Sequence, residues 1–249
     1  MSGPTVRRSR LRAVVPELGF VAAAVAVNLL VRWSTLDDLD RAVANAHDVH
    51  AWQQSVGLDW EHAVQRAALS VPGLAELASR FYVLGYFPVL LGVMAWLFWS
   101  RPEAYRTLRI ALLVSGAIGM LGYAFYPLAP PRLTDLGFHD TVAAGPLDDA
   151  ARPGGLANEI AAMPSFHVGW LALAAAVLFG ATGSLLVRLL AVLHPLVMAW
   201  AVLATGNHWV VDLPAGVLLA ALGLYVARRW PAARPAAGAE PVRSAARRR

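Results

Sequence analysis

Blocks of apolar residues long enough to cross a membrane constrain this chain more than any other feature. Six blocks occur, at about Val14–Val31, Phe81–Trp99, Leu108–Tyr126, Val168–Gly183, Leu185–Ala204 and Trp209–Val226. A helix needs about 20 mainly apolar residues to cross a hydrocarbon core about 30 Å thick. The apolar share of 58% also exceeds the roughly 45–50% that is usual in soluble domains. The sequence therefore predicts an all-α, polytopic membrane protein with six transmembrane helices.

The placement of arginine predicts how these helices are oriented. All 21 basic residues are arginines, and arginine-rich segments alternate along the chain with acidic ones. The arginine-rich segments are the two tails and the connections after the second and fourth spans, whereas the acidic segments precede the second and fourth spans. By the positive-inside rule, we expect both termini in the cytoplasm and the acidic connections outside the inner (plasma) membrane.

The chain is expected to have one folded domain between two tails. Residues 1–13 are predicted to be a basic cytoplasmic tail, 14–230 a six-helix membrane catalytic domain, and 231–249 a disordered basic tail. Residues 34–80 are predicted to hold one or two short interfacial helices between the first and second spans. The histidines of the outer segments, including His50 and His62, are expected to be solvated. Residues 127–162, rich in Pro, Gly and Asp, are expected to form an irregular loop.

Two absences from the composition exclude several kinds of chemistry. The chain has no cysteine, so a disulfide framework, a thiolate nucleophile and a cysteine-ligated metal are excluded. It also has no lysine, which excludes any mechanism that needs one. The arginines that give the net charge of +5 lie beside apolar blocks, so we expect membrane lipid headgroups, and no nucleic acid, as their partners.

A first candidate for chemistry is the pair His208 and Asp212, at the outer start of the sixth span. Residues four apart on a helix share one face, so the carboxylate can reach the imidazole. The carboxylate would fix the histidine tautomer and leave the other ring nitrogen free to attack, as nucleophilic catalysis requires. The alternative is an ion pair at the start of a helix, but ionisable groups at membrane depth are costly and tend to be functional.

Two further segments lie at outer ends of spans. In the first, Ser165 is placed to cap a helix that carries His167 in its first turn, and a helix N-terminus suits an anion such as phosphate. In the second, Pro130 and Pro131 hold Arg132, whose planar guanidinium matches phosphate oxygens. The alternatives are an ordinary capped helix and an arginine that reaches to lipid headgroups. Together the three segments favour phosphoryl transfer, which depends on positioning and charge stabilisation.

These segments resemble the type 2 phosphatidic acid phosphatase superfamily, which has a six-helix core with Pro-Ser-x-His and His-x-x-x-Asp motifs. They occur here as Pro164–His167 and His208–Asp212. Within this superfamily, the chain resembles the inositolphosphorylceramide synthase-like (inositolphosphotransferase) branch in two features: Phe166 in the first motif and the Pro-rich stretch before Arg132. The resemblance covers approximately the second to sixth spans.

The resemblance implies that His208 attacks phosphorus and forms a phospho-histidine, that Asp212 orients it and that His167 protonates the leaving group. Ser165 and Arg132 would hold phosphate oxygens, and no metal or cofactor is implied. The substrate would be a lipid phosphate, diphosphate or phosphodiester, with water or a hydroxyl as acceptor, at a site facing outward.

The chain departs from the common phosphatases at two phosphate-binding cations. It has no lysine before the first-motif arginine, and Val202 stands where those enzymes have a further arginine. We expect Arg80 to substitute, unless it pairs with Glu76, and Asn207 to share in binding phosphate. Fewer cations suit a phosphodiester, which favours inositol-phosphate-type transfer. The alternative is a transporter, flippase or scaffold with the same fold, which would tolerate replacement of His208.

Overall fold

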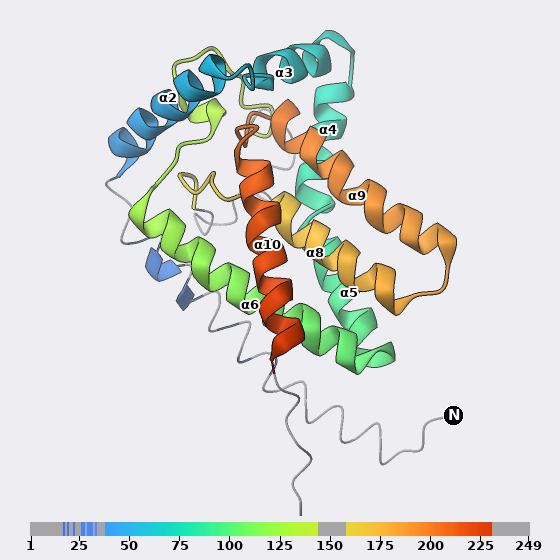
Figure 1. Cartoon of the computed structure of the whole chain (residues 1–249). Helices are drawn as coiled ribbons and strands as arrows, with labels where there is room; N and C mark the ends of the chain where they lie inside the picture. Colours follow the sequence, from blue (N-terminus) through green and yellow to red (C-terminus); the bar gives the residue numbers. More distant parts are fainter. Residues whose placement is uncertain are drawn as a thin grey trace, which may run out of the picture.

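Helices that run alongside one another form the body of the protein (Figure 1). The computed structural model describes residues 38–143 and 158–230, with isolated positions between 17 and 33. The body consists of α4 (Leu74–Leu84), α5 (Phe87–Ser100), α6 (Pro102–Phe125), α8 (Phe166–Ala181), α9 (Leu185–Ala204) and α10 (Asp212–Arg229). No strand occurs among the described residues, in agreement with the predicted all-α class.

Among the described residues, three stretches of helix are long and apolar enough to cross a membrane, whereas the sequence predicts six spans. They are Leu74–Ser100, Pro102–Phe125 and Leu185–Ala204. Helix α8 is apolar but has only 16 residues, and α10 carries Asp212 in its first turn and two arginines in its last. The expected span Val14–Val31 lies largely outside the described residues. The prediction of a membrane protein is supported, whereas the number six is not confirmed.

The second predicted span consists of two helices rather than one. It begins at Leu74 and is interrupted between α4, which ends at Leu84, and α5, which has a proline in its first turn. His194 of α9 lies beside the break, with its Nε2 2.7 Å from the carbonyl oxygen of Gly85. A carbonyl freed at a helix end needs such a partner when it is away from water. His194 is thus a hydrogen-bonded histidine within the bundle.

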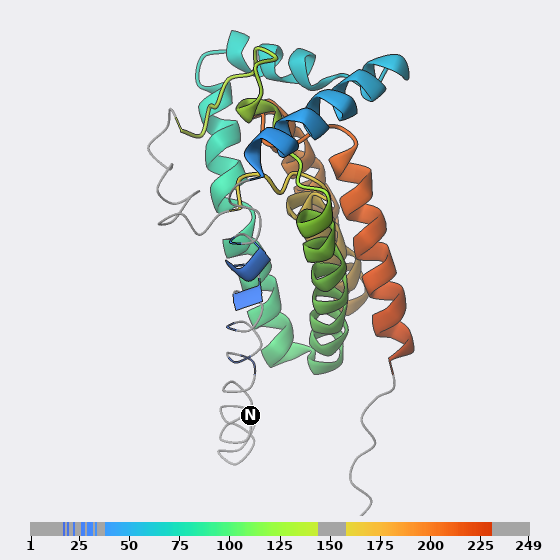
Figure 2. The same cartoon turned by 90° about the vertical axis from the view of Figure 1, so that its left-hand side faces the viewer.

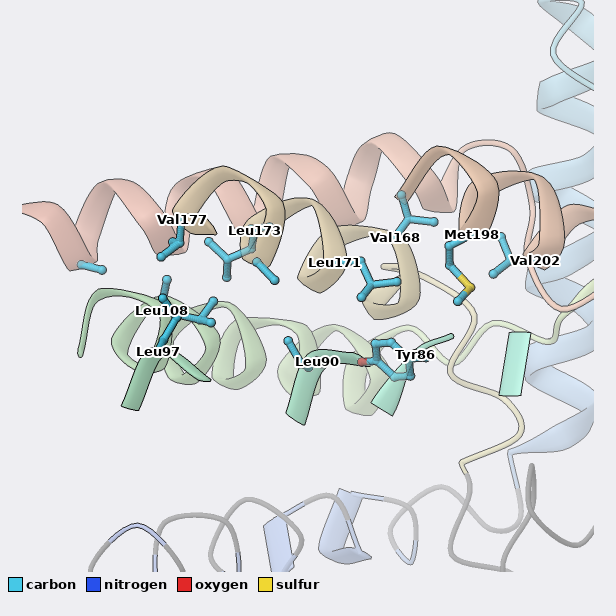
Figure 3. Close-up of a cluster of buried hydrophobic side chains, with 14 of the residues drawn as sticks. Tyr86, Leu90, Leu97, Leu108, Val168, Leu171, Leu173, Val177, Met198 and Val202 are labelled. Atoms are coloured by element: carbon cyan, nitrogen blue, oxygen red, sulfur yellow. The ribbon is translucent and has the colours of Figure 1, made fainter. Parts of the chain in front are cut away.

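The core lies between α8 and α9 on one side and α5 and α6 on the other (Figure 3). Leu97, Leu108, Met198 and Val202 are fully buried there. Many large apolar side chains on the outside of the bundle are exposed instead, such as Leu121, Phe125, Leu186, Leu196 and Leu218. An apolar surface of this kind marks contact with a membrane.

Two short helices, α2 (Leu39–Ser55) and α3 (Glu61–Ser70), lie across one end of the bundle (Figures 1 and 2). We call them the outer layer. They agree with the one or two short helices predicted within residues 34–80.

Below the outer layer, the described parts of residues 127–162 form an irregular chain. It contains the 3-10 turn Pro131–Leu133 and one isolated bridge between Leu128 and Ala161. The expectation of solvated histidines was wrong for His50. Its side chain is buried and packs on the ring of Trp209, with ring centres 5.5 Å apart. His62 likewise stacks on Phe138, at 3.8 Å.

Candidate active site

A turn between α9 and α10 carries the proposed nucleophile. Gly206 follows the end of α9 and has a φ of +68°, a conformation that residues with a Cβ rarely adopt. Buried His208 therefore precedes α10 and does not share a helix face with Asp212, which opens that helix. The turn nevertheless brings the two together, with His208 Nδ1 3.2 Å from Asp212 Oδ2. The same oxygen accepts a 2.8 Å bond from the backbone N–H of Trp209, so the carboxylate is fixed from two sides.

His167 faces His208 from the start of α8. Ser165 caps this helix, because its Oγ accepts from the backbone N–H of Val168 at 3.4 Å. The His167 ring lies against Tyr82 and Tyr86, with ring centres 4.5 and 4.2 Å away. Its Nδ1 is 3.3 Å from His208 Nε2, the nitrogen that Asp212 leaves free. The two imidazoles and the carboxylate therefore form a continuous relay.

The two histidine motifs are also joined through their backbones. The N–H of Ser165 donates to the carbonyl oxygen of Asp212 at 3.0 Å. One turn further along α10, Gly216 lies so close to Ser165 that a Cβ there would be 2.1 Å from the Ser165 carbonyl oxygen. This close approach requires glycine, and it fixes the start of α8 against the start of α10.

Arg132 reaches the same turn from residues 127–143. Its backbone N–H donates to the Gly206 carbonyl oxygen at 3.0 Å, and its Nε donates to Asn207 Oδ1 at 2.9 Å. One terminal nitrogen donates to Asp140 Oδ2 at 3.1 Å. Only 6% of the arginine side chain is exposed, so it does not extend to lipid headgroups at the surface.

The structure does not bring Arg80 to this cluster. Its guanidinium donates to Glu76 at 2.6 Å, and both side chains are more than half exposed. This is the pairing that the spacing of the two residues allowed. Arg32 and Arg152, two further arginines that could supply this charge from the predicted outer side, lie outside the described residues.

Three neighbours of the site were not identified from the sequence. Tyr82 and Tyr86 flank His167, and they lie four residues apart within an apolar block, a spacing that core residues also show. Asp140 faces Arg132 from an irregular segment, where no periodicity marks it. Among the residues that the structure describes, no group of three His, Cys, Asp or Glu side chains is placed to hold a metal ion.

The arrangement has the parts that transfer of a phospho-group needs. Nε2 of His208, which Asp212 does not engage, lies next to the imidazole of His167. The guanidinium of Arg132 is hydrogen-bonded to Asn207, the residue before His208. Stabilisation of charge by groups held in place is the main means of catalysing phosphoryl transfer. Because Asp140 and Asn207 already bind Arg132, an incoming phosphate has to share or exchange these contacts.

Comparison with known proteins points to one family. A model of the PAP2 superfamily matches residues 47–226, which include every motif described above. A search of curated proteins gives no match. Among solved structures, the chain is similar to the crystal structure of LpxE from Aquifex aeolicus, with a TM-score of 0.53 and 18% sequence identity. The similarity covers 68% of this chain and 93% of that one, and it shows a shared fold.

Proposed function

The chain belongs to the PAP2 superfamily, and on this premise we propose that it cleaves a phosphate ester of a membrane lipid through a phospho-histidine at His208. Family and fold make it a PAP2-like phosphatase with helices suited to a membrane. The observation that carries the proposed mechanism is the relay from Asp212 through His208 to His167, with contacts of 3.2 and 3.3 Å.

In the first step, His208 Nε2 attacks phosphorus, and the bond to the leaving lipid oxygen breaks as the new P–N bond forms. Asp212 keeps the proton on Nδ1 and stabilises the charge that develops on the ring. His167 gives a proton to the leaving oxygen. His208 Nε2 and His167 Nδ1 are 3.3 Å apart in the resting site, so the two rings have to separate to admit the phospho-group.

In the second step, an acceptor attacks the phosphorus of the phospho-histidine, the P–N bond breaks to release His208, and His167 takes up the proton of the acceptor. Water gives a phosphatase, and a hydroxyl gives a phosphotransferase. Phe166 and the Pro-Arg stretch support inositol-phosphate-type transfer. The pairing of Arg132 with Asp140 agrees with this, because a cation that is already partly neutralised suits a phosphodiester better than a more highly charged monoester.

The mechanism is tested by following a phosphorus label. Purified protein in lipid micelles is given a labelled lipid phosphate, diphosphate or phosphodiester, and the label is traced to water-soluble phosphate, a new lipid or the protein. His208→Asn should abolish both turnover and protein labelling. His47→Asn is the matched control, because this half-exposed histidine pairs with Asp135 away from the site. Turnover by His208→Asn at the control rate would refute the histidine mechanism and favour a transporter or scaffold.

We further propose that the site faces outward from the plasma membrane, with both termini in the cytoplasm. The chain has no cysteine, so one introduced cysteine can be labelled without background. Ser70→Cys, in the outer layer, should react with a membrane-impermeant maleimide in intact cells. Ser184→Cys, at the opposite end of α9 from the site, should react only after lysis. The reverse pattern would refute this orientation.

A further inference from the structure

Two buried polar side chains of the outer layer contact the turn that carries His208. Gln53 of α2 and Glu61 of α3 are both fully buried. Gln53 Oε1 accepts from the backbone N–H of Val211 at 2.9 Å, and Glu61 Oε1 accepts from the N–H of Val210 at 2.6 Å. Gln53 Nε2 also donates to Glu61 Oε1 at 2.7 Å. Two helices more than 140 residues earlier in the chain thus hold two consecutive amides of the turn.

The position of these amides gives the contacts a mechanistic meaning. Val210 and Val211 lie between His208 and Asp212, so they determine how the imidazole is presented to the carboxylate and to His167. Burying a carboxylate is costly unless it is well hydrogen-bonded. Here Oε1 of Glu61 receives two donors, whereas its Oε2 has no hydrogen-bond partner among the described residues. This acid is buried away from the surface, and its two bonds join the turn, through the N–H of Val210, to Gln53 of α2.

We propose that Gln53 and Glu61 are positioning residues that hold the turn of His208 in line with His167. They do not touch the reacting atoms and act through the backbone of Val210 and Val211. Catalysis that depends on the placement of reacting groups is sensitive to small displacements, and moving a reacting group by about 1 Å can lower the rate about 10²-fold. The inference rests on the proposed function, since it concerns the same nucleophile.

The chain offers a matched control in the same layer. Gln65 of α3 is also buried, and it also ties the outer layer to distant backbone, at His139 and Ala204. Among the described residues, its hydrogen bonds go to His139 and Ala204 and not to Val210 or Val211. A merely structural role for buried glutamine would make Gln53→Leu and Gln65→Leu equivalent, whereas a positioning role separates them.

The experiment compares Gln53→Leu, Glu61→Leu, Glu61→Gln and Gln65→Leu with the full-length wild type in micelles. For each, kcat, KM and melting temperature are measured with a labelled lipid phosphate, together with equilibrium binding of orthovanadate. Gln53→Leu and Glu61→Leu should lower kcat by about 10- to 100-fold with little change in KM, and should weaken vanadate binding in parallel. Glu61→Gln should recover most of the activity, because its amide oxygen can accept the same two bonds. Gln65→Leu should lower the melting temperature comparably and retain most of kcat.

Equal losses of kcat in Gln53→Leu and Gln65→Leu, or no recovery in Glu61→Gln, would overturn the positioning role. Failure of the proposed function looks different, because the wild type itself would then turn over no lipid phosphate. Vanadate binding by the wild type would in that case still test the positioning, through its selective loss in Gln53→Leu and Glu61→Leu. A wild type that neither turns over lipid phosphate nor binds vanadate would overturn both proposals.

Discussion

Replacement of Asp212 by Asn separates the charge of this carboxylate from its hydrogen bonds. A single oxygen, Oδ2, accepts from both His208 Nδ1 and the Trp209 backbone N–H. An asparagine with its amide oxygen in that place keeps both bonds and loses only the negative charge. Asp212→Ala loses the charge and both bonds. Both variants therefore lose the negative charge, and only Asp212→Ala also loses the two hydrogen bonds.

The size of the shared defect follows from the geometry. At 3.2 Å and an effective dielectric constant of about 20, a carboxylate attracts a developing imidazolium by about 5 kcal/mol. Each 1.36 kcal/mol corresponds to a factor of about ten in rate. Since the asparagine dipole keeps part of this attraction, we expect Asp212→Asn to lower kcat/KM by roughly 10³-fold. Asp212→Ala should be at least as slow, and it should also lose about 1–3 kcal/mol of stability from the unpaired Trp209 N–H.

The assay is release of labelled phosphate in micelles, paired with thermal unfolding of the same preparations. Asp135→Asn serves as control, because this exposed carboxylate pairs with His47 away from the site. An Asp212→Asn enzyme within tenfold of the control would refute the view that the charge of Asp212 supports the nucleophile. A large loss of stability in the Asn variant would show that the carboxylate acts through folding instead.

Three shorter predictions concern packing, cations and pH. Gly216→Ala should lower the melting temperature and the activity together, because the new Cβ would be 2.1 Å from the Ser165 carbonyl oxygen, and overpacking typically costs about 1–3 kcal/mol; an unchanged melting temperature would contradict this close contact. Arg132→Gln should reduce kcat/KM by about 10²-fold, since charge-assisted hydrogen bonds to phosphate are strong. Arg80→Gln should change the free energy of unfolding by less than about 1 kcal/mol, as expected for an exposed ion pair. Steady-state kinetics of both variants would show whether Arg80 also binds phosphate. Burial lowers the pKa of His50 from its ordinary value of 6.5, so the neutral form is favoured in the folded protein. The stability that this gives should be complete above pH 6.5 and decline as the pH falls through the lowered pKa. In thermal unfolding from pH 8 to 5, the melting temperature of His50→Gln should therefore fall less with acid than that of the wild type.

The helical segments were predictable where hydrophobicity alone defines them. Helix α9 has the predicted bounds, Leu185–Ala204, because a long apolar run, interrupted only by Arg188, His194 and Pro195, leaves few alternatives. Pro88 alone indicates a kink in the second span, but the position of the break at Gly85 also depends on a histidine from another helix that satisfies the freed carbonyl. A pattern within one segment carries no information on such a partner.

The site shows the same division. Short motifs placed Ser165, His167, His208 and Asp212 near one another, since each motif carries its own cap or partner within a few residues. The assignment of Arg80 to phosphate rested on its position at a span end, and the structure pairs it with Glu76 instead.

Neighbours that act through distant backbone were not predictable. Gln53 and Glu61 lie in a short helical region with ordinary polar composition. Their partners are main-chain amides far along the sequence. No spacing within the outer layer encodes that contact.

The bonds from the outer layer end on main-chain amides, which has a consequence for how such proteins diverge. Any residue except proline supplies an N–H at positions 210 and 211. A change of side chain there leaves the hydrogen bond in place, while positions 53 and 61 must keep an acceptor. Selection on this contact would then conserve positions 53 and 61 in α2 and α3, and it would leave no such mark at positions 210 and 211 beside the nucleophile. In an alignment of relatives, a conserved acidic or amide residue in a poorly conserved outer helix would be the trace of this arrangement.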